Sequence, residues 1–161
     1  MKTLTRAIHI VVVLMLAVSF VSAGTLNLTF NNASGATYPG TSDLTFPYNF
    51  TISGYSGQQL MCMDFANNIS DGQSWSATYA VIGTSSPLID QQSAWLFLQG
   101  ILGNATMVDA NGAVWYLNDG GTAPPLTPGS QNLISSLPTS FTAADLLGPV
   151  IEIHAGKLES G

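Results

Sequence analysis

Cys62 is the single cysteine of this 161-residue chain, and its thiol is the strongest nucleophile that the sequence offers. One cysteine cannot form an internal disulfide framework. Three interpretations of Cys62 therefore stay open. It is a buried apolar thiol, half of a disulfide to another molecule, or a group that takes part in chemistry.

Two aspartates and two aromatic residues near Cys62 could also act on a ligand. Asp64 and Asp71 flank a predicted turn, and glycoside hydrolysis needs a pair of carboxylates. Turns are also where solvated aspartates normally lie. Trp75 and Tyr79 could stack against sugar rings, although large aromatics at this spacing are typical of a core. A carbohydrate-active enzyme that uses Asp64 is thus one hypothesis.

Most other kinds of catalytic or metal site require residues that this sequence does not offer. A Ser-His-Asp triad would have to recruit His154, which lies on a predicted strand near the end of the chain. A structural zinc site needs about four Cys or His ligands, and the Asp-rich loop of a calcium site is missing. We therefore expect no metal, no cofactor and no catalytic residues, and predict that the chain is not an enzyme.

The N-terminus has the pattern of a secretory signal peptide. Lys2 and Arg6 precede an apolar run from Ile8 to Val21, and a small-residue cleavage pattern follows at residues 21–23. We expect cleavage between Ala23 and Gly24, because the run is shorter than the ~20 apolar residues of a membrane-spanning helix. The sequence thus predicts a signal peptide over residues 1–23 and one secreted domain over 24–161.

The charge of the mature chain restricts its partners. Nine acidic side chains remain after cleavage against one cation, Lys157, which gives a formal net charge of −8. Nucleic-acid binding needs clustered basic side chains, so we expect no nucleic-acid partner and no association with an anionic membrane after cleavage. Expected partners are an extracellular polysaccharide or a surface protein, and the expected location is extracytoplasmic, in the medium or at the cell surface.

Hydrophobic patterns predict the elements that position these residues. Alternating strands are expected at 25–30, 46–53, 59–65 around Cys62, and 74–82. Helical spacing follows a Ser-Pro start at 86–87 and ends at Gly103, and a second helix is expected at 107–117. Residues 131–137 and 142–147 are expected as short helices and 150–154 as a last strand.

These elements predict an α+β fold. We expect an antiparallel β-sandwich or an open barrel that carries a helical insert and a C-terminal strand. The expected organisation is a β-rich part over 24–83, a helical part over 86–118, a loop with short helices over 119–148, and the terminal strand over 149–155.

Four short motifs resemble a family of exported proteins, common in Acidobacteria, that usually end in a PEP-CTERM sorting segment. The motifs are LMCMDF at 60–65, GQSW at 72–75, AWL at 94–96 and AVW at 113–115, within a resemblance that covers about residues 48–115. This chain departs from the family at its end, because residues 159–161 are not followed by a Pro-Glu-Pro motif, an apolar helix or a basic tail. The sorting segment is therefore expected to be absent or truncated.

The chain also resembles the thioester domains of Gram-positive surface adhesins, through a Cys-x-Asp strand and a helix motif ending in Ala-x-Trp. In those domains the cysteine sulfur is joined to a glutamine side chain and captures an amine. The resemblance implies that Cys62 is the nucleophile and that Asn111 is the acyl donor, although an asparagine stands where the motif has glutamine. The leading prediction is a non-enzymatic surface protein with a binding, matrix or adhesion role, and covalent adhesion through Cys62 is the alternative.

Overall fold

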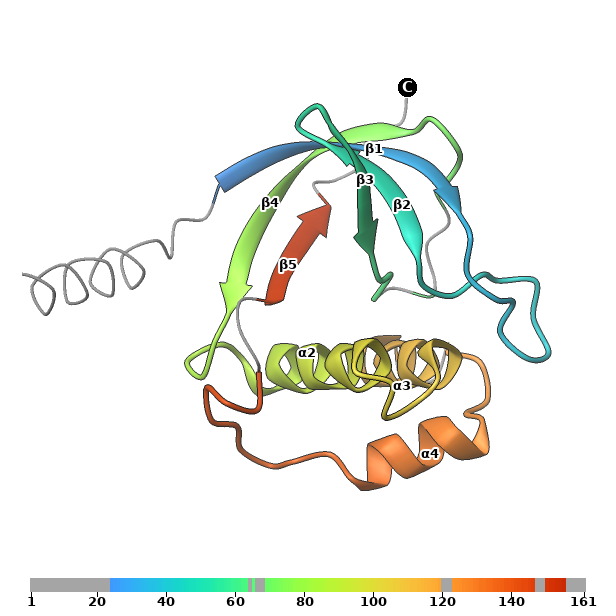
Figure 1. Cartoon of the computed structure of the whole chain (residues 1–161), viewed down its shortest axis with the longest axis vertical. Helices are drawn as coiled ribbons and strands as arrows, with labels where there is room; N and C mark the ends of the chain where they lie inside the picture. The colour runs from blue at the N-terminus through green and yellow to red at the C-terminus, as the bar shows by residue number, and fades with distance from the viewer. Residues whose placement is uncertain (1–23, 64, 66–68, 120–122, 147–149, 156–161) are drawn as a thin grey trace, which may run out of the picture.

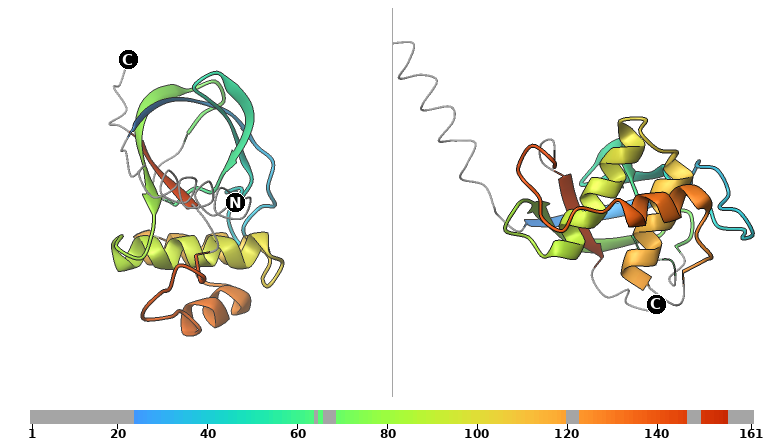
Figure 2. Two further views of the ribbon diagram at one scale, coloured as in Figure 1. Left: turned by 60° about the vertical axis from the view of Figure 1, so that its left-hand side comes forward. Right: turned by 90° about the horizontal axis from the view of Figure 1, so that it is seen from below.

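The computed structural model describes residues 24–63, 65, 69–119 and 123–146, and the backbone of 150–155. A strongly curved antiparallel sheet arches over a pair of helices, and a third helix lies on the far side of that pair (Figures 1 and 2). The helices follow the fourth strand in the chain and precede the last. This arrangement confirms the predicted α+β class.

Five strands form the sheet in the order β3-β2-β1-β4-β5, and every neighbouring pair is antiparallel. The strands are β1 (Gly24–Ala33), β2 (Tyr48–Ile52), β3 (Tyr55–Leu60), β4 (Ser74–Ile82) and β5 (Val150–Ala155). No hydrogen-bonded ladder joins β3 to β5 among the described strands, so the sheet has two edges. Of the two predicted forms, a sandwich and an open barrel, this open sheet corresponds to the second. The last strand, β5, returns to the sheet as expected.

The third strand lies earlier in the chain than the predicted strand 59–65. The β2–β3 hairpin turns at Ser53 and Gly54, whose φ angles are 48° and 88°. Two left-handed residues in a row make the tight turn that matches the twist of a hairpin, so β3 begins at Tyr55. As a result β3 ends at Leu60, and Cys62 lies in the segment after the strand instead of within it.

The two faces of the sheet have opposite character. Leu28, Phe30, Phe50 and Ala77 point inward and are buried in the core of the sheet. The outer face carries uncharged polar side chains that bond across strands, as where the Thr29 and Ser74 hydroxyls lie 2.8 Å apart. This alternation is the period of two that the sequence shows in β1 and β4.

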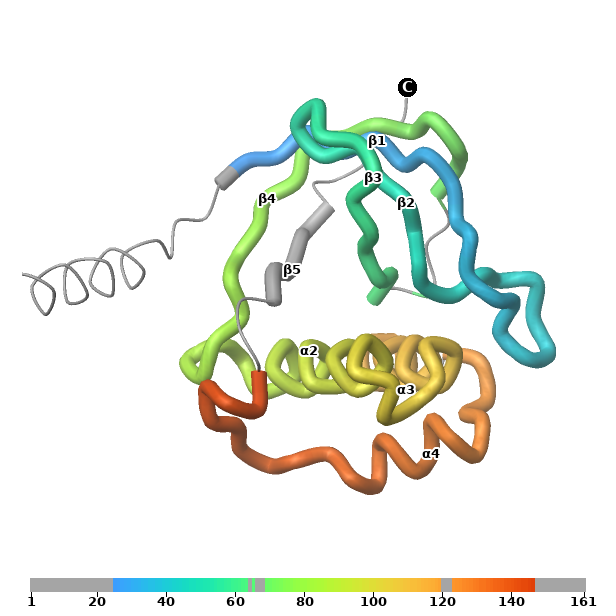
Figure 3. Tube along the Cα trace, in the orientation of Figure 1, coloured from blue at the N-terminus to red at the C-terminus, as the bar shows by residue number. Residues whose placement is uncertain are grey.

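The helix layer consists of α2 (Leu88–Ile101) and α3 (Met107–Asp119), with α4 (Pro128–Ser135) packed on α3. Residues 110–115 of α3 are all buried, because the helix lies between α2, α4 and the loop of residues 34–47. That loop joins β1 to β2 and extends from the sheet toward the helix layer, at the right of Figure 3.

The helix predicted at 142–147 is not present in the described residues. Residues 143–146 form a turn, which the hydrogen bond from the Asp145 N–H to the Thr142 carbonyl closes at 3.1 Å. The Asp145 carboxylate also accepts from the Thr142 backbone N–H at 2.7 Å and the Thr142 hydroxyl at 2.6 Å. These side-chain bonds satisfy the local donors, so the backbone has no need of a longer helix here.

Candidate functional site

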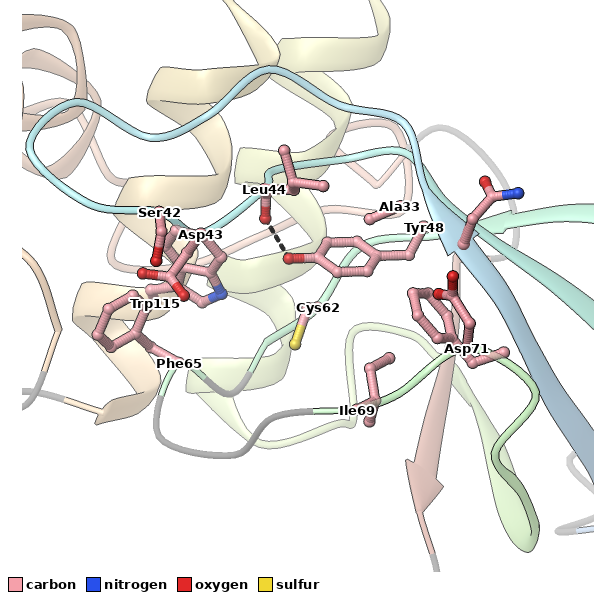
Figure 4. A pocket seen from close by; sticks show the side chains of 12 residues that line it. Ala33, Ser42, Asp43, Leu44, Tyr48, Cys62, Phe65, Ile69, Asp71 and Trp115 are labelled. Carbon is pink, nitrogen blue, oxygen red and sulfur yellow. Dashed lines mark hydrogen bonds between the residues drawn. The ribbon is translucent and has the colours of Figure 1, made fainter.

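A pocket of about 340 Å³ opens where the concave face of the sheet meets the 34–47 loop and α3. Four aromatic rings line it, together with the carboxylates of Asp43 and Asp71 and the thiol of Cys62 (Figure 4). The rings are those of Phe30, Tyr48, Phe65 and Trp115. Its volume lies at the lower end of the range of ligand pockets, about 300–1,000 Å³.

Trp115 brings an unsatisfied hydrogen-bond donor to this pocket. The side chain is only 1 % exposed, and its Nε1 has no hydrogen-bond partner in the described part of the chain. Its ring is fixed between Tyr38 and Phe65, whose ring centroids lie 5.6 and 5.1 Å from its own. In Figure 4 the indole nitrogen lies on the pocket side of the ring. A buried donor without a partner is unfavourable, so an acceptor at this point would stabilise the site.

Tyr48 presents a hydroxyl that stays protonated. Burial raises the pKa of the Tyr48 phenol well above its usual range, and negative charge at Cys62 and Asp43 raises it further. The hydroxyl donates to the Leu44 carbonyl, which fixes the ring against the 34–47 loop (Figure 4). Tyr48 therefore acts as a rigid wall of the pocket, not as a base.

The Asn111 side chain contacts the backbone of Cys62. The Asn111 side chain is fully buried, and its Nδ2 donates to the Cys62 carbonyl oxygen at 3.0 Å. Its Oδ1 accepts from the Phe46 backbone N–H at 2.9 Å. The half-buried Cys62 places its sulfur in the pocket (Figure 4). The carboxamide thus bridges two backbone segments next to the only thiol.

The position of Asn111 follows from helix geometry. Residues four apart lie on one face of an α-helix, so Asn111 and Trp115 both face the 34–47 loop and the segment after β3. Asn111 reaches Phe46 and Cys62, and Trp115 packs against Tyr38 and Phe65. The Asn-x-Ala-x-Trp spacing of the sequence thereby places a carboxamide and an indole on the same side of α3.

The other predicted site residues are placed apart from this pair. Trp75 is half-buried on β4, and its ring centroid lies 6.0 Å from that of Phe50 in the core of the sheet. Its Nε1 is also buried without a partner in the described residues. Tyr79 is half-buried further along β4, opposite Gly24. Trp75 therefore packs against the core of the sheet, and a role for it in contacting a ligand stays a prediction.

Asp64 and Ala23 lie outside the described residues, and Gly24 is the first residue of β1. His154 lies on the backbone of β5, opposite Thr78. Within the described residues, no group of three or more His, Cys, Asp or Glu side chains is placed to hold a metal ion. None of the helices in this part of the chain has the length and apolar character needed to cross a membrane.

The 34–47 loop contributes Asp43 to the pocket, and the sequence gives little sign of this, because the loop has the polar composition of an ordinary turn region and no periodicity. Tyr48, at the start of β2, was expected on a strand but not at a site. The one signal available was Tyr38, a large aromatic within that polar segment, which is 1 % exposed in the structure.

The described geometry therefore provides an open pocket with aromatic walls, two carboxylates, a thiol and a buried indole donor. Comparison with models of protein families, with curated proteins and with solved structures found no match to this chain, so its function has to be inferred from the site itself.

Proposed function

We propose that this chain is an exported, non-enzymatic protein that acts outside the cytoplasm, in the medium or at the cell surface, and binds a ligand in the pocket between the sheet and α3. The observation that carries the proposal is the buried Trp115 indole N–H, which has no partner among the described residues and lines an open, aromatic-walled cavity. Concave sites with aromatic walls and a few polar groups are usual places where proteins bind small ligands.

The chemistry of the lining supports binding over catalysis. Among the described pocket residues, the groups that titrate are two aspartates, a thiol and a phenol whose pKa burial raises. A phenol held protonated cannot accept a proton near neutral pH. The composition of the chain, with two histidines and three Lys or Arg residues, offers few other catalytic groups.

The first test concerns export. The full chain is expressed with its N-terminus intact, and the protein in the culture medium is sequenced from its N-terminus. We expect it to begin at Gly24, which is also where β1 begins. A protein that stays in the cytoplasm at full length would contradict the proposal.

The second test blocks the pocket. Ser42 is exposed and lines the pocket, so Ser42→Phe should fill part of the cavity without disturbing the core. The matched control is Ser85→Phe, at an exposed position in the turn before α2. The purified secreted protein is mixed with washed cells of the producing culture, or with their extracellular polysaccharide, and the bound fraction is measured by sedimentation. We expect the parent and Ser85→Phe to bind equally and Ser42→Phe to lose most of its binding.

A second candidate is covalent adhesion through a thioester between Cys62 and Asn111. The specific observation in its favour is that the Asn111 carboxamide bonds to the backbone carbonyl of Cys62 while the Phe46 N–H donates to its oxygen, a contact that polarises the carbonyl. In the reaction the Cys62 sulfur bonds to the side-chain carbonyl carbon of Asn111. The bond from that carbon to Nδ2 breaks, and ammonia leaves with the thiol proton.

Intact mass separates the two candidates. Loss of ammonia lowers the mass by about 17 Da in the parent but not in Cys62→Ala, provided that the protein is purified without added amines. Asn111→Gln restores the side-chain length of the motif and should increase the fraction with the lower mass. If both the parent and Asn111→Gln have the calculated mass, and a thiol probe labels Cys62 on unfolding, covalent adhesion is excluded and non-covalent binding remains.

A further inference from the structure

We propose that the ligand of this pocket is a neutral polyhydroxy compound, a saccharide unit, held between the Trp115 indole N–H and the carboxylates of Asp43 and Asp71. This inference rests on the proposed binding function and adds the chemical class of the ligand. It follows from the hydrogen-bonding capacity of the groups that line the cavity.

The indole defines the first requirement. Trp115 is 1 % exposed, and its Nε1 lacks a partner in the described residues. An indole N–H can only donate, so the ligand has to place an acceptor there. The rings of Tyr38 and Phe65 pack against the buried indole, and the donor therefore cannot turn away to find another partner.

The two carboxylates define the second requirement. Asp43 lies on the 34–47 loop and Asp71 in the segment that precedes β4, and both line the same cavity. Neither side-chain carboxylate takes part in a hydrogen bond among the described residues. An ionised carboxylate can only accept, so the ligand has to bring donors to it.

These two requirements exclude ions of either sign. An ammonium group has donors but no acceptor, so it would leave the Trp115 N–H unpaired. A carboxylate or a phosphate would satisfy Trp115, but Asp43 and Asp71 would repel it, and the expected net charge of the mature chain is −8. A hydroxyl group both donates and accepts. Several hydroxyls on one ring can therefore satisfy the indole and the carboxylates together.

The remaining walls fit the same class. Phe30, Tyr48 and Phe65 provide apolar ring surface, and the C–H faces of a sugar ring pack well against such surfaces. The volume of about 340 Å³ admits one small ligand unit rather than a long enclosed chain. Because the pocket is open to solvent, the rest of a polymer could continue outside it.

The test follows the indole N–H directly. A ¹H–¹⁵N spectrum of the secreted protein shows the indole cross-peaks of its three tryptophans, and Trp115→Phe identifies the peak of Trp115. The probes are D-glucose, D-galactose and D-mannose as neutral sugars, methylammonium chloride as the cation and sodium acetate as the anion. We expect at least one sugar to shift the Trp115 peak in a saturable way, while the Trp95 peak and both ionic probes show no such effect.

Asp43→Asn and Asp71→Asn test the carboxylates without disturbing the core, because neither residue is fully buried. A hydrogen bond to a charged group contributes enough that each change should weaken sugar binding about tenfold or more. Asp90→Asn, in the first turn of α2, is the matched control and should bind like the parent.

The outcomes separate this inference from the proposed function. If an ionic probe shifts the Trp115 peak and no sugar does, the ligand class is wrong and the binding function stands. If no probe shifts the peak while Ser42→Phe still abolishes binding to cells or polysaccharide, the assignment to a saccharide unit at Trp115 is overturned alone. If Ser42→Phe also binds like the parent, the pocket is not the binding site and both proposals fail.

Discussion

Asn111 shows how much one side chain can determine in this protein. It lies in the middle of α3, fully buried, and binds backbone groups of two segments that are far from it in sequence. Its carboxamide thereby pairs with the Phe46 N–H and the Cys62 carbonyl, which are both partly buried. Asn111 is therefore a structural bridge, whatever chemistry Cys62 performs.

Replacing Asn111 with leucine, which has a similar volume, should destabilise the protein strongly. Two partly buried hydrogen bonds are lost, and a typical one contributes about 0.5–1.5 kcal/mol, so we expect a loss of about 1–3 kcal/mol in the free energy of unfolding. Urea denaturation measures the change. Asn132→Leu, at an exposed position of α4, is the control and should change stability by less than about 0.5 kcal/mol. Equal stability of the two variants would show that the bridge contributes little.

Asp145 provides a pH-dependent interaction at the residue scale. Its hydrogen bonds from the Thr142 hydroxyl and the Thr142 backbone N–H lower the pKa of its carboxyl group. A lowered pKa means that the folded state favours the charged form. The resulting stability is present at neutral pH and is lost as the pH falls below the ordinary carboxyl range, through the folded-state pKa.

Thr142→Ala removes the hydroxyl donor, so the pKa of Asp145 should rise toward its ordinary value. The pKa is measured by following the side-chain carboxyl carbon by NMR during an acid titration. Thr139→Ala changes an exposed threonine nearby and should leave this pKa where it is in the parent. An unchanged pKa in Thr142→Ala would mean that the backbone N–H alone holds the carboxylate.

At the scale of the elements, α4 begins at a side-chain cap. The Thr127 hydroxyl accepts from the Ser130 N–H at 3.0 Å, and Pro128 follows at the first helical position. The same hydroxyl donates to the Asp109 carboxylate on α3. One threonine therefore both starts α4 and ties it to its neighbour.

Thr127→Ala should lower the free energy of unfolding by about 1–2 kcal/mol, because the helix loses its cap and Asp109 loses a donor. Thr127→Ser keeps the hydroxyl and should recover most of the loss. The difference is measured by thermal and urea unfolding of both variants. Thr84→Ala, in an exposed turn, is the control. A serine variant as unstable as the alanine variant would indicate that the methyl group of Thr127, not its hydroxyl, stabilises α4.

The elements that the sequence predicted well are those in which one pattern repeats. The alternation in β1 and β4 and the helical spacing in α2 and α3 each continue over two or more turns or strand repeats, so burial of one face decides the conformation. Prediction failed where a tight turn or a local side-chain bond decides the conformation. Two left-handed turn residues, Ser53 and Gly54, moved β3 toward the N-terminus, and the Asp145–Thr142 bonds replaced a short helix with a turn.

The site was predictable only in part for the same reason. The resemblance to thioester domains pairs Cys62 with Asn111; the structure shows a bond from the Asn111 side chain to the Cys62 backbone carbonyl, and the thioester itself stays a prediction. The contribution of Asp43 was not predictable, because the 34–47 loop has no periodic pattern that could locate it. Its position depends on contacts of Tyr38 and Phe46 with α3, which are more than sixty residues away in the chain.

At the scale of the whole molecule, several contacts join the sheet to the helix layer. In one, Ile82 of β4 packs with Ala94 of α2 and with Leu146. In another, the 34–47 loop packs on α3, where Tyr38 contacts Trp115 beside the pocket. The shape of the pocket therefore depends on how closely the loop approaches α3.

Gly112 permits that close approach. A Cβ atom at this position would lie 2.3 Å from Cε2 and 2.5 Å from the hydroxyl oxygen of Tyr38. Tyr38 cannot easily move away, because its hydroxyl donates to the Pro125 carbonyl and accepts from the Thr127 N–H, both at 3.2 Å. Glycine in the middle of a helix costs about 1 kcal/mol relative to alanine. The close packing of Tyr38 against Gly112 offsets this cost.

Gly112→Ala should therefore destabilise the protein even though alanine favours a helix. Over-packing costs about 1–3 kcal/mol or more, and a contact this short lies at the upper end, so we expect a net loss of at least about 1 kcal/mol in urea unfolding. The Trp115 indole peak should shift as well, because Tyr38 packs against that ring. Gly83→Ala is the matched control, since a Cβ there meets nothing within 4 Å, and it should be neutral or slightly stabilising. If Gly112→Ala were as stable as Gly83→Ala and left the Trp115 peak in place, the loop would be free to move from α3, and the pocket would not depend on this contact.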